Sequence, residues 1–235
     1  PRARARGLRM AVMQGRVLVC AGSDSGGGAG IQADIKAVTA LGGFAMTAIT
    51  ALTAQDTRGV HGVIGVPADF IALQIRVVLQ DLGADAIKTG MLADSTTIAA
   101  VCDTLAVHGP GIKLVADPVM VAKGGHPLLA PDAVATLRDR LLPMASVITP
   151  NIPEAEALSG LTISDVPSMH RAAEKLLGMG VRAVLLKGGH GTGEVLTDLL
   201  ATQAGTEAFE SPRLATRHTH GTGCTLASAP VSYTH

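Results

Sequence analysis

The chain has 235 residues and a formal net charge of zero, because 19 basic side chains balance 19 acidic ones. Hydrophobic residues make up 47% of the chain and charged residues 16%, which excludes a disordered protein, since disorder needs low hydrophobicity and high net charge. One tyrosine, three phenylalanines and no tryptophan give few aromatic surfaces for base stacking, so we expect no nucleic-acid partner.

No apolar run reaches the roughly 18 residues that a membrane helix needs, so we expect no membrane partner. The three cysteines are far apart in the sequence and no two have metal-ligand spacing. Such an odd, scattered set is typical of a reducing compartment, and we expect a cytoplasmic protein.

Residues 1–16 contain five arginines and no acidic residue. This basic leader lacks the apolar run of a signal peptide. We interpret it as a non-native or disordered segment upstream of a start at Met10 or Met13. A targeting segment or an electrostatic tether is the alternative.

Short aliphatic runs alternate with amphipathic stretches along the rest of the chain. Strands are expected at residues 17–21, 45–51, 86–89, 113–116, 146–149 and 183–186, and helices at 29–41, 69–82, 95–107, 131–141 and 168–179. This alternation predicts βαβ units and a parallel sheet. The expected fold class is therefore α/β, with a central, mostly parallel sheet flanked by helices on both faces, in one domain. Residues 59–66 are expected to form a small β flap.

A glycine-rich turn follows the first strand, at residues 22–30, and leads into a helix. Glycines at a helix start let backbone N–H groups approach an anion, although a plain tight turn is an equally good interpretation. The turn is not a Walker loop, because no Gly-Lys-Ser/Thr follows it. Asp34 lies in the first helical turn, either as an acid that compensates the helix dipole or as a hydrogen-bond acceptor in a pocket.

Two further strands end in polar residues. Asn151 and Glu154 have the spacing of a capping box, and the same pair could hold a hydrated magnesium ion beside phosphates. Lys187 follows an apolar strand directly and precedes two glycines, which places it well to meet a phosphate. A solvated surface lysine is the alternative.

A last glycine turn, with Gly221, Thr222 and Gly223, leads into a helix of small residues. Its backbone N–H groups are expected to form an anion hole. Cys224 stands at the start of this helix, where thiol pKa values fall, although a lone cysteine is often a small buried hydrophobe.

Taken together, the motifs resemble the hydroxymethylpyrimidine/phosphomethylpyrimidine kinases of thiamine biosynthesis, a family of the ribokinase superfamily. Seven stretches carry the resemblance in family order: AGSDSGGGAGIQADIKA, ITALTAQDTRGV, IKTGML, ADPVM, LLPMASVITPNIPEAEAL, VLLKGGH and THGTGCTLASA. The resemblance implies a ribokinase-like fold with its active site at the carboxyl edge of the sheet. It also implies that ATP and Mg²⁺ serve to phosphorylate 4-amino-5-hydroxymethyl-2-methylpyrimidine and then its monophosphate.

The resemblance also assigns roles to residues. Gln55 would hydrogen-bond the pyrimidine edge, and the same pocket would be lined by Asp34, Gly22, Ala29, Thr53 and Met91. Lys187 and Asp117 would lie at the ATP phosphates, and Asn151 and Glu154 would bind magnesium through waters. The transferred phosphoryl group would meet the turn of Gly221, Thr222 and Gly223. Cys224 would be the base, at the position where related sugar kinases carry aspartate.

The family continues beyond the last glycine turn, whereas here six residues without resemblance follow position 229. We therefore expect a truncated kinase domain at residues 17–229 and a non-native junction at residues 230–235, with Pro230 breaking the last helix. The expected assembly is a homodimer. Two alternatives remain: a pyridoxal or pyridoxine kinase, and an inactive ligand-binding fragment of the fold.

Overall fold

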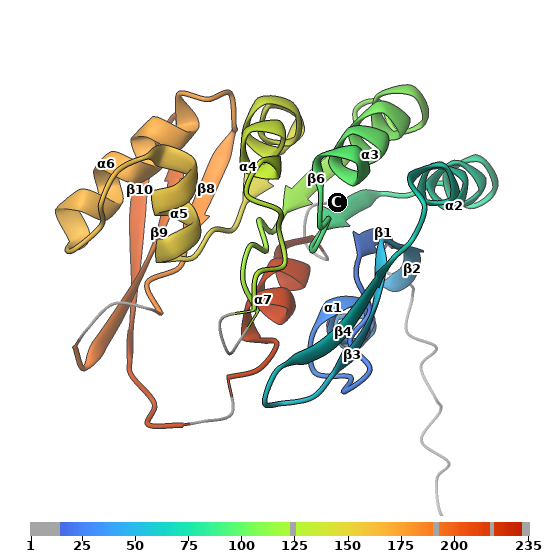
Figure 1. Ribbon diagram of the computed structural model, residues 1–235. Helices are drawn as coiled ribbons and strands as arrows, with labels where there is room; N and C mark the ends of the chain where they lie inside the picture. The colour runs from blue at the N-terminus through green and yellow to red at the C-terminus, as the bar shows by residue number, and fades with distance from the viewer. Residues whose placement is uncertain (1–14, 123–125, 190–192, 217–218, 232–235) are drawn as a thin grey trace, which may run out of the picture.

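The computed structural model describes residues 15–122, 126–189, 193–216 and 219–231. Its centre is an eight-stranded sheet with the order β10-β9-β8-β7-β6-β5-β1-β2 (Figure 1). The strands are β1 (Arg16–Ala21), β2 (Phe44–Ile49), β5 (Ala86–Thr89), β6 (Lys113–Ala116), β7 (Val147–Ile148), β8 (Ala183–Leu186), β9 (Val195–Thr202) and β10 (Gly205–Pro212). Every neighbouring pair of strands from β2 to β8 is parallel, whereas β9 pairs antiparallel with β8 and β10 pairs antiparallel with β9. The predicted mostly parallel α/β sheet is confirmed.

Helices cover both faces of the sheet (Figure 1). On one face α1 (Gly30–Ala40) and α7 (Thr222–Val231) pack against each other. The other face carries α2 (Ala68–Asp81), α3 (Ser95–His108), α4 (Ala133–Thr136) with a π turn (Leu137–Leu141) and a 3-10 turn (Leu142–Met144), α5 (Ile152–Ser159) and α6 (Val166–Leu177).

The alternation of side chains along β1 explains the two cores. Leu18 and Cys20 belong to the larger core under α2 and α3, whereas Val17, Val19 and Ala21 belong to the smaller core on the opposite face, with Ile31 and Val38 of α1. Successive residues of a strand point to opposite faces, and both faces of this strand are buried. A continuous aliphatic run is therefore what the strand requires.

The expected flap is present as an antiparallel pair, β3 (Ala51–Gln55) with β4 (Val60–Gly65). The single strand expected at residues 45–51 is divided at Thr50. The N–H of Thr50 donates to the carbonyl of Ala21 and its hydroxyl donates to the carbonyl of Met91, so the chain leaves the sheet here. The flap thus begins directly beside the loops that follow β1 and β5.

Three expectations need correction. Strands β9 and β10 were not predicted; β10 is exposed along its whole length and so lacks a buried face. Arg16 does not belong to a leader, because it begins β1 and forms an ion pair with Asp85. Pro230 does not break the last helix: α7 runs to Val231, and a proline one residue before its end removes a single hydrogen bond.

The remaining expectations for the leader and the junction fall on residues 1–14 and 232–235, outside the described part of the chain. Within the described part, no helix has both the length and the apolar character needed to cross a membrane.

Candidate active site

The predicted site residues gather at the carboxyl edge of the parallel strands. The first glycine turn follows β1, Asp117 follows β6, Asn151 follows β7 and Lys187 follows β8. Ligands bind at this edge in open α/β sheets, because the loops after neighbouring strands meet there. The N-terminus of α7 approaches the same edge through its contacts with β5 and β6.

Lys187 and Asp117 form the charged centre of the site. The ammonium of Lys187 lies 3.1 Å from Oδ1 of Asp117, and both side chains are largely buried. The hydroxyl of Thr149 donates to the same carboxylate oxygen at 2.8 Å. A lysine held in this way has little freedom, so its charge stays at one place on the edge of the sheet.

Asn151 and Glu154 form the predicted capping box at the start of α5. The Asn151 side chain accepts from the N–H of Glu154, and the Glu154 carboxylate accepts from the N–H of Asn151, both at 2.9 Å. Burial, followed by the nearby charge of Asp117, raises the pKa of Glu154 to about 7. The box also connects to the charged centre, because Asn151 and Lys187 form a parallel bridge between their backbones.

The last glycine turn lies against both the first glycine turn and Lys187. Gly221 has a φ of +78°, and a methyl group on it would lie 1.7 Å from the carbonyl oxygen of Gly28. A methyl group on Gly223 would lie 3.4 Å from the Lys187 ammonium. Thr222 begins α7 and its N–H donates to the carbonyl of Thr219 at 3.4 Å, whereas the next N–H groups of the first turn have no acceptor within the helix. Backbone donors and the lysine therefore face the same space.

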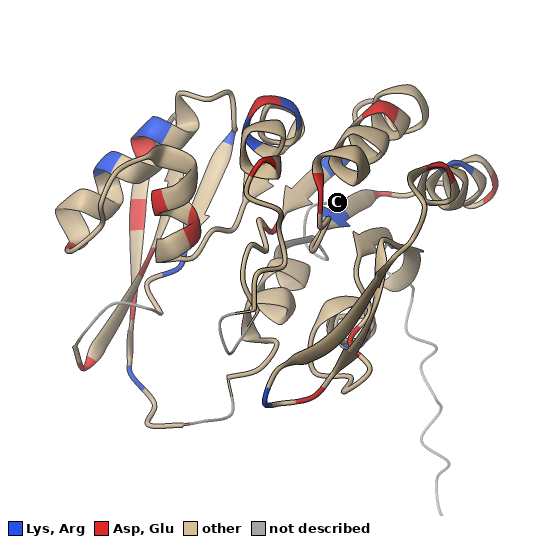
Figure 2. Cartoon of the chain, viewed as in Figure 1, with Lys and Arg blue, Asp and Glu red and all other residues tan. Residues whose placement is uncertain are grey.

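α7 itself contains no charged residue, and neither do β3 and β4 (Figure 2). An anion at the start of α7 would consequently meet backbone N–H groups and a lysine from another element, Lys187. Such fixed donors need little rearrangement when an anion binds.

The residues expected to line the pyrimidine pocket are also neighbours. A methyl group on Gly22 would lie 3.3 Å from the sulfur of Met91. The hydroxyl of Thr53 lies 2.8 Å from the carbonyl oxygen of Ser23 and 3.3 Å from Oε1 of Gln55. Ala29 belongs to the same turn and donates its N–H to Asp24 at 2.8 Å.

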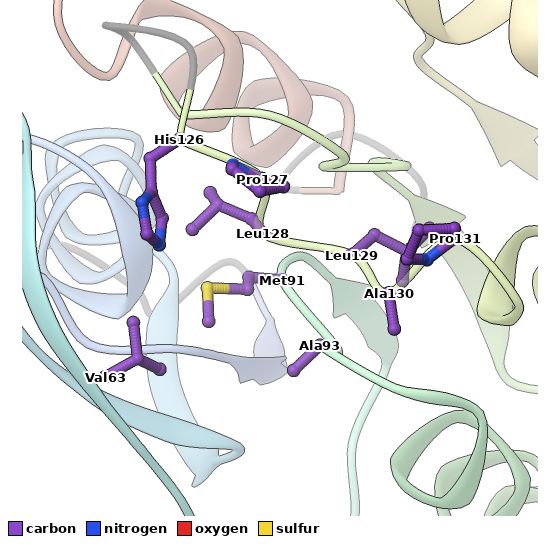
Figure 3. Close-up of a pocket in the computed structure, with 9 residues that line it drawn as sticks. All are labelled: Val63, Met91, Ala93, His126, Pro127, Leu128, Leu129, Ala130 and Pro131. Atoms are coloured by element: carbon purple, nitrogen blue, oxygen red, sulfur yellow. The ribbon is translucent and has the colours of Figure 1, made fainter.

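A cavity of about 290 Å³ borders this group of residues. Figure 3 shows Val63 of the flap and Met91, which follows β5, facing His126 and the segment after it. Apolar atoms form most of the lining, as an aromatic ring requires. The segment at residues 126–131 was not predicted to belong to the site, because it contains no glycine turn and its one polar side chain, His126, is part of no motif.

A hydrogen-bonded link between the two glycine turns was not predicted. Nε2 of His220 lies 2.8 Å from Oδ2 of Asp24, and Asp24 accepts further hydrogen bonds from the N–H groups of Gly26, Gly28 and Ala29. Burial alone would raise the pKa of Asp24, but His220 and these N–H groups lower it below its ordinary value. His220 and Asp24 are 196 residues apart, so no local motif could reveal their contact.

Asp34 does not lie as an open acceptor in a pocket. It is fully buried, and its carboxylate accepts hydrogen bonds from Lys88 at 3.0 Å and from Ser228 at 2.6 Å. Cys224 also differs from expectation: burial raises the pKa of its thiol, and the nearby charge of Lys88 only partly offsets this. The N–H of Gly30 lowers this pKa to a smaller extent. The resting side chain is therefore a thiol near neutral pH.

Three solved structures with this architecture are small-molecule kinases. Phosphomethylpyrimidine kinase from Clostridium difficile is 42% identical, with a TM-score of 0.82 over 93% of this chain and 89% of that chain. The ADP complex of Bacillus subtilis pyridoxal kinase is 38% identical, with a TM-score of 0.85 over 92% of this chain and 82% of that chain. The pyridoxal kinase of Staphylococcus aureus was solved with AMP-PCP and is 35% identical, with a TM-score of 0.84 over 93% of this chain and 79% of that chain. The fold and the site therefore define a ribokinase-like kinase.

Sequence relatives narrow this class. The model of the phosphomethylpyrimidine kinase family matches residues 24–234. The hydroxymethylpyrimidine/phosphomethylpyrimidine kinase of Streptomyces coelicolor is 48% identical over 91% of this chain and 78% of its own length. The thiamine biosynthesis bifunctional protein of Geobacter sulfurreducens is 52% identical over 94% of this chain, which spans 45% of that relative. The chain belongs to the hydroxymethylpyrimidine/phosphomethylpyrimidine kinase family of thiamine biosynthesis, and the predicted family, fold and enzyme class are confirmed.

The Asp24–His220 link gives a prediction about stability and pH. A lowered carboxyl pKa stabilises the fold above the pKa of the unfolded chain, about 3.9, and this stabilisation is lost as the pH falls through the folded value. Asp24→Asn should therefore lower the thermal midpoint near pH 7, and its deficit should shrink below about pH 4. Thermal unfolding across this range measures the effect, with the exposed Asp81→Asn as a matched control. A deficit that does not depend on pH would contradict the link.

Proposed function

We propose that this chain transfers the γ-phosphoryl group of ATP to the hydroxymethyl oxygen of 4-amino-5-hydroxymethyl-2-methylpyrimidine, and then transfers a second one to the monophosphate. The observation that carries the proposal is the position of the Lys187 ammonium between Asp117 and the glycine turn at the start of α7. Family membership and the nucleotides in the solved pyridoxal kinases support ATP as the donor.

In the proposed reaction the substrate oxygen bonds to the γ-phosphorus while the bond from that phosphorus to the β,γ-bridging oxygen breaks, which releases ADP. Phosphoryl transfer depends mainly on positioning and on stabilising charge on the transferred group. Lys187 would balance the phosphate charge, and the N–H groups of Gly221, Thr222 and Gly223 would hydrogen-bond the equatorial oxygens. Gln55 would hydrogen-bond the amino and ring nitrogens of the pyrimidine, since its amide both donates and accepts.

The proton of the substrate hydroxyl needs an acceptor, and we assign this role to Cys224. Its sulfur is carried by the first turn of α7, and the N–H of Gly30 in the first glycine turn lowers its pKa. Because burial raises the thiol pKa, only a minor thiolate fraction is present near neutral pH. Turnover should therefore rise with pH until the thiol is fully ionised.

Asn151 and Glu154 fit a magnesium ion that keeps its water molecules. Both offer oxygen ligands, which magnesium prefers, but each already has a partner in the capping box. No three His, Cys, Asp or Glu side chains of the described residues cluster closely enough to hold a metal ion by themselves. When bound, the metal would neutralise phosphate charge, and these two residues would orient its waters.

The proposal includes a homodimer in the cytoplasm. Leu52 and Ile64 of the flap are 49% and 70% exposed, and apolar side chains gathered on one surface favour association. The described cysteines, Cys20, Cys102 and Cys224, are all free, which suits a reducing compartment. Light scattering of the purified chain would show whether its mass is that of two copies.

The substrate assignment is tested by measuring ADP release with the pyrimidine, its monophosphate and pyridoxine as separate acceptors. We expect turnover with both pyrimidines. The fold is shared with pyridoxal kinases of 34–38% identity, so pyridoxine is the acceptor that competes with this assignment. Turnover with pyridoxine alone would replace the proposed substrate, and no turnover with any acceptor would favour an inactive ligand-binding fragment.

Lys187→Met should lower kcat by about 100-fold and leave KM for the pyrimidine nearly unchanged, because a charge on the transferred group acts in the transition state. The matched control is Lys175→Met, which removes an exposed lysine on α6. Steady-state kinetics of both variants check the expectation. Equal kcat values for the two variants would show that Lys187 does not act in phosphoryl transfer.

Gly221→Ala should lower turnover by about 100-fold, because the added methyl group overlaps the Gly28 carbonyl and displaces the N–H groups of the turn. Gly111→Ala is the matched control: Gly111 also has a positive φ, +81°, but nothing lies within 4 Å of an added methyl group. Both variants place an alanine at a positive φ, but only Gly221→Ala brings the added methyl group into contact with another part of the backbone. Similar turnover in both would show that the contact between the glycine turns is unimportant for activity.

A further inference from the structure

Lys88 is a fully buried lysine for which the proposed reaction has no role. It lies in β5 next to the last residue of the strand, and its side chain is 0% exposed. An ammonium ion is costly to bury unless it is paired and hydrogen-bonded. Its Nζ lies 3.0 Å and 3.1 Å from the two carboxylate oxygens of Asp34. The charge is therefore retained inside the protein, and the pKa of Lys88 is raised by Asp34, Cys224 and Asp117 against the effect of burial.

The Lys88–Asp34 pair connects three elements of the site. Asp34 belongs to α1, Lys88 to β5, and the hydroxyl of Ser228 in α7 donates to Oδ1 of Asp34 at 2.6 Å. Ser228 lies one helical turn after Cys224, on the same side of α7. α7 is thus attached to α1 directly behind the turn whose N–H groups face the phosphate space.

We propose that Lys88 is a positioning residue for phosphoryl transfer, which fixes the first turns of α7 against α1 through Asp34 and Ser228 and places a positive charge behind the sulfur of Cys224. This inference rests on the proposed role of Cys224 as the proton acceptor. The positive charge increases the thiolate fraction at a given pH, and so increases the fraction of molecules that are ready to accept the proton.

The charges around Cys224 support this assignment. Asp34 of α1 and Asp117 after β6 both raise the thiol pKa, whereas Lys88 of β5 and the N–H of Gly30 lower it. Lys187 is already paired with Asp117. Without Lys88, burial and two carboxylates would all oppose ionisation of the thiol.

A purely structural role is the competing explanation, in which Lys88 only neutralises Asp34. The double variant Lys88→Met/Asp34→Asn separates the two. It removes both charges and keeps similar side-chain volumes, so it leaves no unpaired charge in the interior. A structural role predicts normal activity in this variant, whereas the proposed role predicts a loss.

The first readout is the reactivity of Cys224 itself, measured as the rate of iodoacetamide labelling against pH and located by mass spectrometry. Only the thiolate reacts, so the profile reports the thiol pKa without any need for kinase activity. Burial raises the pKa of Cys20 to about 12 and that of Cys102 to about 11, so these two cysteines serve as unreactive internal references. The double variant also removes Asp34, which raises the thiol pKa. Because Lys88 acts on the thiol more strongly than Asp34, the Cys224 profile should still move upward, by less than about one pH unit.

The second readout is steady-state kinetics with the pyrimidine. In the double variant kcat near neutral pH should fall by up to about tenfold, in proportion to the smaller thiolate fraction. KM for the pyrimidine should change little, and the rise of kcat with pH should shift in the same direction as the labelling profile. Lys175→Met again serves as the matched control, and both of its profiles should coincide with those of the unmodified chain.

An unchanged labelling profile in a folded double variant would overturn the proposal, as would a wild-type kcat. If the double variant does not fold, Lys88→Gln decides, because glutamine keeps a hydrogen-bond donor toward Asp34 and removes only the charge. An upward shift of its labelling profile supports the proposal and an unchanged profile overturns it. A labelling shift in a chain without kinase activity would refute the proposed function and leave the effect of Lys88 on Cys224 intact.

Discussion

The close contact between the two glycine turns is the constraint on which the site depends. The backbone of Gly221 lies against the carbonyl of Gly28 with no room for a methyl group between them, and His220 pairs with Asp24 across the same contact. One turn continues into α1 and the other into α7, so the contact fixes both helix starts at one edge of the sheet. The expected pyrimidine pocket and the proposed anion-binding turn are neighbours for this reason.

The second organising feature is that two lysines at the site are each paired with an aspartate. Lys187 pairs with Asp117 at the surface of the site and Lys88 pairs with Asp34 below it, each at about 3 Å. Neither lysine is a mobile surface charge. A donor that is already oriented needs little rearrangement when negative charge develops, which is the main electrostatic advantage of a folded site over water.

Much of the fold could be predicted from the sequence, because parallel strands that are buried on both faces appear as nearly continuous apolar runs, such as residues 17–21. The motifs also identified most residues that gather at the edge of the sheet. The hairpin of β9 and β10 was missed because an exposed edge strand carries no such run. Lys88 was missed because a lysine is ordinarily a surface residue, and its partners Asp34 and Ser228 are distant in sequence.

The attachment of α7 to α1 has a consequence for folding kinetics. The contact between Ser228 and Asp34 spans 194 residues of chain, and the contact between His220 and Asp24 spans 196. Closing so long a loop before the intervening sheet exists has a large entropic cost, whereas the parallel strands between them can pair in shorter steps. We therefore expect the last glycine turn to be completed late in folding, so that a partly folded chain that already has its sheet would lack the proposed phosphate site.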